Sequence, residues 1–415
     1  MTPAPLKLDP SQERAVELMC TARFGVVTGG PGTGKTTCLR HGLDRLDKLR
    51  KRYALAAPTG KAAKRMHETT GREAQTIHRL LEFHPKHGFQ RNRDNPIEAD
   101  VVIIDEASMI DVELGATLFR AIDKNRTRVI LIGDANQLPP VAPGKVFADV
   151  VHGSESRQLA VPLVRLQTLH RSAQQSWIHT AARRVLEGKL PDLHERPDFR
   201  FLEVENSIDI LPVLRELVTV DVPRMDVDAQ VLIPQHTGPA GIDVANSMLQ
   251  EALNPRGEDD PFLPRSKSEL RIGDRVIQTR NNYDLGVFNG EIGAITAIDK
   301  DGAVVELMGR PPVRYTLEQA HALQLAYALT VHRSQGSEWP WVICVVHSTH
   351  AHSLTRQLVY TAITRGKQGV IIVGNQKGLQ HAVKGRVSVE RNSALVERTC
   401  ALMTAAANDS ERHTA

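Results

Sequence analysis

The feature that most constrains this chain is a glycine-rich stretch near its N-terminus, GVVTGGPGTGKTTCLRHGL, Gly25–Leu43. An apolar run of strand length leads into it, and a helical pattern begins at Gly34. Between the two, the spacing G-x-x-x-x-G-K-[ST] is filled by Gly29, Gly34, Lys35 and Thr36. In that spacing, backbone N–H groups and the positive end of a helix surround phosphate oxygens. A chance glycine-rich turn would need neither the strand nor the helix, so the stretch predicts a nucleotide-binding loop.

The side chains of this loop divide between the phosphates and a metal ion. Lys35 is expected to reach the β- and γ-phosphates, and the Thr36 hydroxyl is expected to hold Mg²⁺. The expected cofactors are therefore ATP and Mg²⁺. The predicted nucleotide-binding residues of the loop are Gly30, Gly32, Thr33, Gly34, Lys35, Thr36 and Thr37.

Composition narrows the class of protein further. A chain of 415 residues is long enough for about two to three domains, each with its own core. The net charge of +4 is weak evidence for a polyanionic partner. The four cysteines lie far apart without metal-ligand spacing, which indicates reduced thiols in a cytoplasmic protein. Because no apolar run approaches about 18 residues, we expect no membrane-spanning segment.

The order of apolar runs predicts an α/β fold with two parallel-sheet domains. YALAAPT, DVVIIDEA and RVILIGD have strand length, and helical patterns such as DVELGATLFRAI separate them. This alternation is typical of a parallel sheet with helices on both faces, where ligands bind at the carboxyl ends of the strands. The pattern then restarts without a second phosphate loop. The strands predicted there are residues 163–169, 230–233, 341–347 and 369–374.

The predicted domains are residues 1–162 and 163–400, followed by a C-terminal tail at 401–415. Residues 271–320 break the alternation within the second domain. GDRVIQTRNN, GEIGAITAID and GAVVELMG are short β-type runs separated by Asn, Gly and Asp turns. We therefore expect an inserted small β-barrel in that range.

Two acids and a glutamine follow the predicted strands of the first domain. In VVIIDEASM, Asp105 at the strand tip suits Mg²⁺, and Glu106 can orient or deprotonate the attacking water. In LIGDANQLPPV, Gln137 stands where a γ-phosphate sensor would, although its local sequence also fits a plain turn before two prolines. The acid pair after a phosphate loop predicts hydrolysis of the nucleotide as well as binding.

A series of motifs then runs through the chain: GGPGTGKTT, APTGKAAKRM, TIHRLL, IIDEASM, GDANQLPPV, LHR, ALTVHRSQGSEW and VYTAITRG. Together they resemble the motif series of superfamily 1 DNA helicases, and they are most similar to the RecD-like branch. The resemblance covers residues 8–400 and implies two RecA-like motor domains. The chain departs from the family at its start, because bacterial RecD-like proteins often carry a long N-terminal extension. Functions housed in that extension cannot be carried over.

The resemblance implies further residues around the nucleotide. Gln12, in LDPSQ, would recognise adenine. Arg171, in TLHR, and Arg365, in AITRG, would act as arginine fingers that stabilise charge on the γ-phosphate. Glu338, in GSEW, would complete the site through the ribose or a water molecule. Without the resemblance, Gln12 and both arginines would be interpreted as ordinary surface residues.

The resemblance also implies a set of DNA contacts. Pro58, Thr59, Gly60 and Lys61 follow a strand and open a helix, an arrangement that presents backbone N–H groups to a DNA phosphate. The other implied contacts are Thr76 and His78 in the first domain and Thr330 and His332 in the second. A helical histidine more often satisfies a core hydrogen bond, so the two histidines depend on their motifs. Since aromatic residues make up 4% of the chain, backbone contacts should outweigh base stacking.

Residues 81–98 are predicted to form an inserted β-hairpin. Phe83 and Phe89 would form its apolar tip, and Arg91 would add positive charge. In RecD-like helicases the matching insertion is a pin that separates the strands of the duplex ahead of the motor. An unremarkable surface loop is the alternative interpretation.

We therefore expect a monomeric, ATP-driven motor that moves 5′ to 3′ on single-stranded DNA and opens forked duplex DNA, in repair or recombination. The direction follows from the resemblance alone. A metabolic kinase or nucleotide switch is one alternative, but it would need no second α/β domain with arginines and DNA contacts. A translocase that does not unwind, acting as the motor of a larger complex, is another. Strand separation on a forked duplex would distinguish it.

Overall fold

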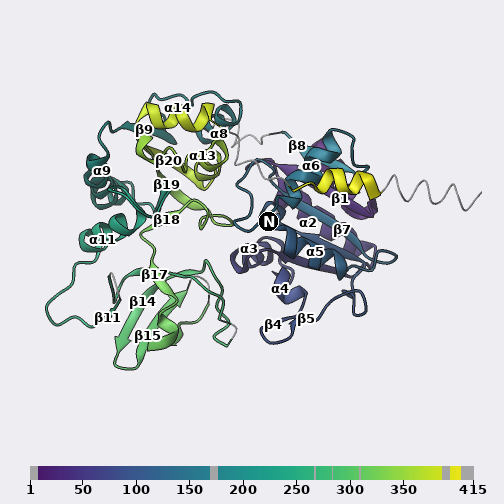
Figure 1. The fold of residues 1–415 in the computed structure, drawn as a ribbon, viewed down its shortest axis with the longest axis horizontal. Coiled ribbons are helices and arrows are strands. Elements are labelled where there is room, and N and C mark those ends of the chain that lie inside the picture. Colours follow the sequence, from purple (N-terminus) through teal and green to yellow (C-terminus); the bar gives the residue numbers. More distant parts are fainter. Residues whose placement is uncertain are drawn as a thin grey trace, which may run out of the picture. The chain divides into compact units, whose positions relative to one another are not determined.

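The computed structural model describes residues 8–168, 176–265, 268–282, 284–307, 310–385 and 393–402. The chain divides into two compact units, which Figure 1 shows as ribbons. The first unit comprises Met1–Pro58, Ala62–Gln175 and Val389–Ala415, and the second comprises Thr59–Lys61 and Ser176–Ser388. No helix within the described ranges is long and apolar enough to cross a membrane.

The first unit is built on a six-stranded parallel sheet. Its strands are β1 (Phe24–Gly29), β2 (Tyr53–Ala57), β3 (Gln75–Thr76), β6 (Val101–Ile104), β7 (Arg128–Gly133) and β8 (Leu163–Leu166), in the order β3-β2-β6-β7-β1-β8. Alternate residues of β6 point to opposite faces: Val102 and Ile104 belong to one apolar cluster, and Val101 and Ile103 to another. Both faces are therefore buried, as in other sheets that helices cover on two sides.

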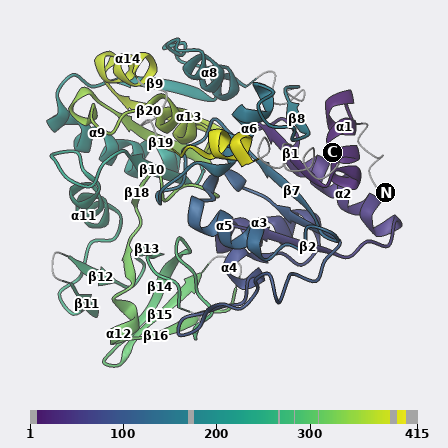
Figure 2. The ribbon, with the colours of Figure 1, turned by 45° about the vertical axis from the view of Figure 1, so that its right-hand side comes forward.

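Helices also contribute to both clusters. α1 (Pro10–Thr21), α2 (Lys35–Lys48) and α3 (Gly60–Thr70) contribute to one face, and α4 (Ile77–Leu80), α5 (Val112–Arg120) and α6 (Val146–Glu155) to the other. α1 and α2 lie side by side (Figure 2), so close that a β-carbon on Gly42 would lie 2.6 Å from the Met19 sulfur.

The second unit contains a five-stranded parallel sheet in the order β18-β10-β19-β20-β9. The strands are β9 (Phe199–Glu203), β10 (Ala229–Ile233), β18 (Ala328–Thr330), β19 (Trp339–Val346) and β20 (Gly366–Gly374). Its helices include α8 (Trp177–Leu186), α9 (Ile210–Glu216), α11 (Ile242–Leu253), α13 (Arg356–Ile363) and α14 (Gln376–Lys384). The predicted strands at 230–233, 341–347 and 369–374 correspond to β10, β19 and β20. The prediction of two parallel-sheet α/β domains is confirmed.

An antiparallel sheet is inserted into the second unit between β10 and β18 (Figure 1). Its strands are β13 (Arg275–Gln278), β14 (Ile292–Asp299), β15 (Gly302–Leu307), β16 (Val313–Thr316) and β17 (Leu323–Leu325), in the order β16-β15-β14-β13-β17. A short hairpin of β11 (Phe262–Pro264) and β12 (Glu269–Arg271) precedes it. The insertion has its own apolar core, and it extends past the predicted end at residue 320.

The structure corrects the assignment of one strand. Residues 163–169 were expected to open the second domain, but β8 pairs in parallel with β1 in the first unit. Residues 393–400, predicted as part of the second domain, also group with the first unit. There the side chain of Val396 lies near Gly153 of α6, and the Ser393 hydroxyl donates to the Asp149 carboxylate. A short apolar strand fits the edge of either sheet, so its neighbours, rather than its own sequence, decide where it pairs.

Candidate active site

The phosphate loop joins the carboxyl end of β1 to the start of α2. Gly32 and Gly34 have φ angles of 72° and 86°, which side-chain-bearing residues rarely adopt. The Lys35 Nζ donates to the carbonyls of Gly29 at 2.6 Å and Gly30 at 2.9 Å. The Thr33 hydroxyl also donates to the Gly30 carbonyl, at 2.8 Å. The loop is therefore already folded into a compact turn, with the lysine ammonium held across it.

The acid pair stands one strand away from the strand that leads into the loop. β7 lies between β1 and β6, and Asp105 and Glu106 follow β6 directly. Because all three strands are parallel, their carboxyl ends lie at the same edge of the sheet. The Glu106 N–H donates to Asp105 Oδ1 at 2.8 Å, and Glu106 has a φ of 52°. A non-glycine residue in this left-handed region is strained, and such strain concentrates at functional sites.

The Asp105 carboxylate lies among both acidic and basic groups. Desolvation, followed by the neighbouring Glu106 carboxylate, raises the pKa of Asp105. Lys35 and Arg65 lower that pKa, so both basic groups lie close to the carboxylate. A bound cation would act in the same direction as these two residues, because it favours the charged form of the acid.

Gln137 is the third candidate functional feature at this edge of the sheet, after the phosphate loop and the acid pair. It follows β7, the strand between those that lead to the loop and to the acid pair, as predicted. Its side chain is 6% exposed, and its Oε1 has no hydrogen-bond partner among the described residues. A buried acceptor without a partner is costly, so such an atom in a ligand site is a candidate contact for water or substrate.

The donor set fits magnesium. The Thr36 hydroxyl and the Asp105 carboxylate are hard oxygen ligands of the kind that Mg²⁺ prefers. In the part of the chain that the structure describes, no three His, Cys, Asp or Glu side chains gather at one point to form a metal cage. Mg²⁺ typically takes one or two protein oxygens and fills its other positions with phosphate oxygens and water.

Gln12 lies beside the phosphate loop. It belongs to the capping box that begins α1: the Asp9 side chain accepts from the Gln12 N–H, and Gln12 Oε1 accepts from the Asp9 N–H at 3.1 Å. The Gln12 Nε2 donates to the Thr33 carbonyl at 3.3 Å, and the side chain is 1% exposed. The structure thus ties this glutamine to the loop, while its contact with adenine stays a prediction.

The residues predicted from the second domain have different surroundings. Arg365 is 2% exposed, and its guanidinium donates to the carbonyls of Thr361 at 3.2 Å and Ser337 at 3.1 Å. Glu338 forms an ion pair with Lys367 at 3.5 Å. Arg171 lies outside the described residues.

The DNA contacts predicted in the first domain follow two strands. Pro58 and Thr59 connect β2 to α3, which begins at Gly60, as predicted. Residues 59–61 group with the second unit, whereas the rest of α3 groups with the first. Thr76 ends β3, and its hydroxyl caps α4 by accepting from the Arg79 N–H at 3.2 Å.

In the second unit, Thr330 ends β18 and a turn of residues 331–336 follows it. The Thr330 hydroxyl accepts from the Arg333 N–H at 3.1 Å, and Thr330 itself is buried. His332 is exposed on this turn. Thr330 therefore shapes the turn that presents His332 to solvent.

The hairpin exists, but the predicted apolar tip is wrong. β4 (Phe83–His84) and β5 (Gly88–Phe89) follow α4 (Figure 1) and pair so that Phe83 faces Phe89. The two rings lie 4.9 Å apart and both contact the His78 ring, at 5.7 and 5.6 Å. The aromatic rings therefore anchor the base of the hairpin, because apolar rings gain more by packing on the domain than by facing water.

The exposed tip of the hairpin is instead residues 84–87. The rings of His84 and His87 stack there at 4.7 Å, and Lys86 is exposed between them. Arg91, predicted to add positive charge to the strand-separating hairpin, is bonded to Glu82 at 2.8 Å and to the Pro96 carbonyl at 3.0 Å. It stabilises the base of the loop.

Sequence reasoning missed Arg65, which lies in the quoted motif APTGKAAKRM and acts electrostatically on Asp105. One turn of a helix separates it from Lys61, so the helical spacing of basic residues after β2 is a signal that could have found it. It also missed the left-handed backbone of Glu106, for which the sequence carries no signal.

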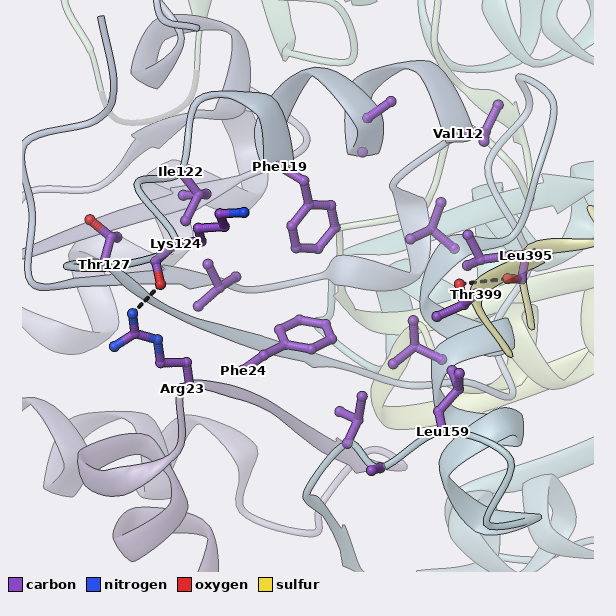
Figure 3. Close-up of a pocket in the computed structure, with 17 residues that line it drawn as sticks. Arg23, Phe24, Val112, Phe119, Ile122, Lys124, Thr127, Leu159, Leu395 and Thr399 are labelled. Carbon is purple, nitrogen blue, oxygen red and sulfur yellow. Dashed lines mark hydrogen bonds between the residues drawn. The ribbon is translucent and has the colours of Figure 1, made fainter. Parts of the chain in front are cut away.

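A large apolar pocket lies elsewhere in the first unit (Figure 3), with a volume of about 520 Å³. Its lining includes Phe24 and Val129, near the amino ends of β1 and β7, and Phe119 of α5. The phosphate loop follows the opposite, carboxyl end of β1. The pocket is therefore separate from the candidate active site.

A parallel sheet that brings a phosphate loop, an acid pair and a buried glutamine to one edge defines the class of phosphate-loop nucleoside triphosphatases. Three family models match: the AAA domain at residues 12–143, the ATP-dependent RecD-like DNA helicase SH3 domain at 245–307, and the UvrD-like helicase C-terminal domain at 325–373. The RecBCD enzyme subunit RecD of Mycolicibacterium smegmatis is 33% identical over 90% of this chain and 72% of its own length. The chain belongs to the RecD family of superfamily 1 helicases.

Two further relatives extend the comparison. The ATP-dependent RecD2 DNA helicase of Deinococcus radiodurans is 37% identical over 94% of this chain, but the chain spans only 52% of that relative's length. A crystal structure of Pif1 helicase from Bacteroides, in complex with ADP-AlF3 and single-stranded DNA, has a TM-score of 0.59 at 20% identity. It covers 96% of this chain and 98% of its own. This likeness shows that the fold of two RecA-like domains is shared.

Proposed function

We propose that this chain is a monomeric, cytoplasmic ATP-driven motor that moves 5′ to 3′ on single-stranded DNA and opens forked duplex DNA, in repair or recombination. The observation that carries the proposal is the edge of the first sheet, where the loop, the acid pair and Gln137 follow three neighbouring strands. The relative from Deinococcus radiodurans, named a DNA helicase, supports DNA as the track.

Each residue of this edge has a distinct part in hydrolysis. Lys35 exchanges its bonds to the Gly29 and Gly30 carbonyls for bonds to the β- and γ-phosphates. Glu106 accepts the proton of the attacking water, while the unpartnered Oε1 of Gln137 orients that water. Mg²⁺, held by Thr36 and Asp105, would neutralise charge on the phosphate oxygens. Gln12 would face the adenine.

The two arginines of the second predicted domain complete the transition-state contacts. The Arg365 guanidinium is held by two neutral carbonyls, which fix its direction without cancelling its charge. Among the described residues no carboxylate forms an ion pair with Arg365, and a fixed positive charge of this kind suits a group that stabilises the γ-phosphate in the transition state. Arg171 is proposed to act with it, and Glu338 to reach the ribose or a water molecule.

The DNA track is proposed to run over three sets of residues. The first set is Pro58–Lys61, where β2 leads into α3. The second is the pair Thr76 and His78, and the third is Thr330 and His332 in the second unit; all three would contact the DNA backbone. The strand-separating element is then the hairpin tip at residues 84–87, supported by the rings of Phe83 and Phe89 at its base. The exposed Lys86 supplies positive charge there.

An unwinding assay on 5′-tailed and 3′-tailed duplexes tests the proposal. We expect ATP-dependent opening of the 5′-tailed substrate alone, and no opening by Glu106→Gln, which should still bind ATP. Opening of the 3′-tailed duplex alone would contradict the direction. An ATPase that single-stranded DNA does not stimulate would contradict the motor itself and favour a kinase or nucleotide switch.

A translocase that does not unwind, acting as the motor of a larger complex, is a second candidate. It is favoured by the small size of the hairpin, whose strands have two residues each, and by relatives that are named subunits of the RecBCD enzyme. DNA-stimulated hydrolysis without opening of either duplex would select it.

A further inference from the structure

A fully buried carboxylate joins three segments of the second unit. Asp274, just before β13, is 0% exposed. Its Oδ2 accepts from the Arg271 N–H at 2.7 Å and from Gln250 Nε2 at 2.6 Å. Its Oδ1 accepts from Asn254 Nδ2 at 2.8 Å and from the Tyr327 hydroxyl at 2.9 Å. The four bonds use all four lone-pair positions of a carboxylate, so the group is held in a single orientation.

Side-chain amides on helix α11 and at its C-terminal end form a row that reaches the surroundings of Asp274. Asn246 and Gln250 are four residues apart on α11, a spacing that places side chains on one stripe of a helix, and Asn254 is the C-cap residue that follows the helix. Asn246 Oδ1 accepts from the Ala328 N–H at 2.8 Å, and its Nδ2 donates to the Ala328 carbonyl at 3.0 Å. The row therefore bonds β18 at one end and the inserted sheet at the other.

The segment held in this way leads directly into the candidate DNA contacts. The chain leaves the inserted sheet at β17, passes Tyr327, and enters β18, which ends at Thr330 ahead of the turn with His332 (Figure 1). β18 stands at one edge of the parallel sheet, and an edge strand has one row of backbone groups without a strand partner. Asn246 bonds the backbone N–H and carbonyl of Ala328 in this strand. The hydrogen bond between Asp274 and Tyr327 anchors the strand where it begins.

We propose that Asp274 and Tyr327 are positioning residues that preorganise the DNA-contacting turn at Thr330 and His332. They fix how β18 emerges from the inserted sheet, so that less conformational freedom is lost when DNA binds. The inference rests on the proposed function, because DNA contact by Thr330 and His332 is part of it. Neither Asp274 nor Tyr327 needs to touch DNA or nucleotide.

The test removes a single hydroxyl. Tyr327→Phe deletes the bond to Asp274 and keeps the ring. Tyr315→Phe is the matched control, because Tyr315 lies in the same inserted sheet, is 0% exposed, and has a hydroxyl without a partner among the described residues. ATPase activity is titrated with oligo(dT), and melting temperature and DNA-free hydrolysis are recorded for each protein. An intramolecular hydrogen bond to a charged acceptor is worth about tenfold in an equilibrium constant, and where that bond orders the turn before DNA binds, its loss lowers the affinity by the same factor.

We expect Tyr327→Phe to raise the oligo(dT) concentration for half-maximal stimulation by about tenfold, with DNA-free hydrolysis and turnover at saturating DNA unchanged. Tyr315→Phe should shift it by less than about twofold. Equal shifts in the two variants, or a Tyr327→Phe protein whose DNA-free hydrolysis falls in parallel, would overturn the positioning role while leaving the motor intact. A wild-type protein without DNA stimulation would remove the proposed function and this inference with it.

Discussion

Replacing Gln137 with methionine tests whether a buried polar atom serves chemistry at the expense of stability. Gln137 Oε1 is buried and lacks a partner among the described residues. A buried acceptor without a partner costs about 1–3 kcal/mol. Methionine has a similar length, no comparable acceptor and a flexible side chain that fills irregular space. Because imperfect packing offsets part of the gain, we expect Gln137→Met to raise the free energy of unfolding by about 1 kcal/mol.

The same change should lower ATP turnover by about 10²-fold, since the attacking water loses the group that orients it. Urea unfolding without nucleotide measures the stability, and single-turnover hydrolysis with Mg²⁺ and saturating oligo(dT) measures the chemistry. Gln357→Met is the matched control, because Gln357 Oε1 is also buried and has no partner in the described part of the chain, but it lies on α13, in the second unit. It should gain stability without losing hydrolysis. A Gln137→Met protein that is less stable and hydrolyses ATP normally would refute the reasoning on both counts.

Three further predictions follow from the same structure. Replacing residues 84–87 by a Gly-Ser turn should abolish duplex opening while DNA-stimulated hydrolysis persists at saturating DNA and fixed salt; unwinding that survives the replacement would exclude the hairpin as the separating element. Arg365→Lys should leave ATP affinity within a few-fold but lower turnover by about 10²-fold, since a lysine ammonium cannot reproduce the planar fork; early melting without a specific loss of turnover would instead indicate a structural role. Burial and the neighbouring His347 lower the pKa of His350 to about 4, so unfolding takes up a proton below the unfolded pKa of about 6.5. The free energy of unfolding should therefore fall by about 2 kcal/mol more in the wild type than in His350→Phe between pH 7.5 and 5, and equal pH dependence in urea titrations would contradict the assignment.

The sequence alone determined the chemistry of the first unit, because that chemistry depends on short-range spacing. The interval between Gly29 and Lys35 defines a loop whatever surrounds it, and Gly32 and Gly34 indeed adopt left-handed backbones there. The runs that became β6 and β7 end in Asp105 and in the turn to Gln137, and parallel strands must bring such ends to one edge. For the same reason, the sequence was sufficient to predict the α/β class and to find the motifs in their order.

Only the tertiary structure decided which strands pair and which side chains pack together, because the local sequence allows more than one arrangement. Residues 163–166 are apolar enough for either sheet, and their pairing with β1 is a long-range choice. Phe83 and Phe89 have the same residue types whether they lie at a hairpin tip or at its base, and the neighbouring His78 ring decided for the base. The local sequence around Asp274 predicts only a turn residue between two strands. The Arg271 N–H is a local donor three residues away, but the other three donors come from segments that the chain brings together only on folding, so no spacing in the sequence could have indicated them.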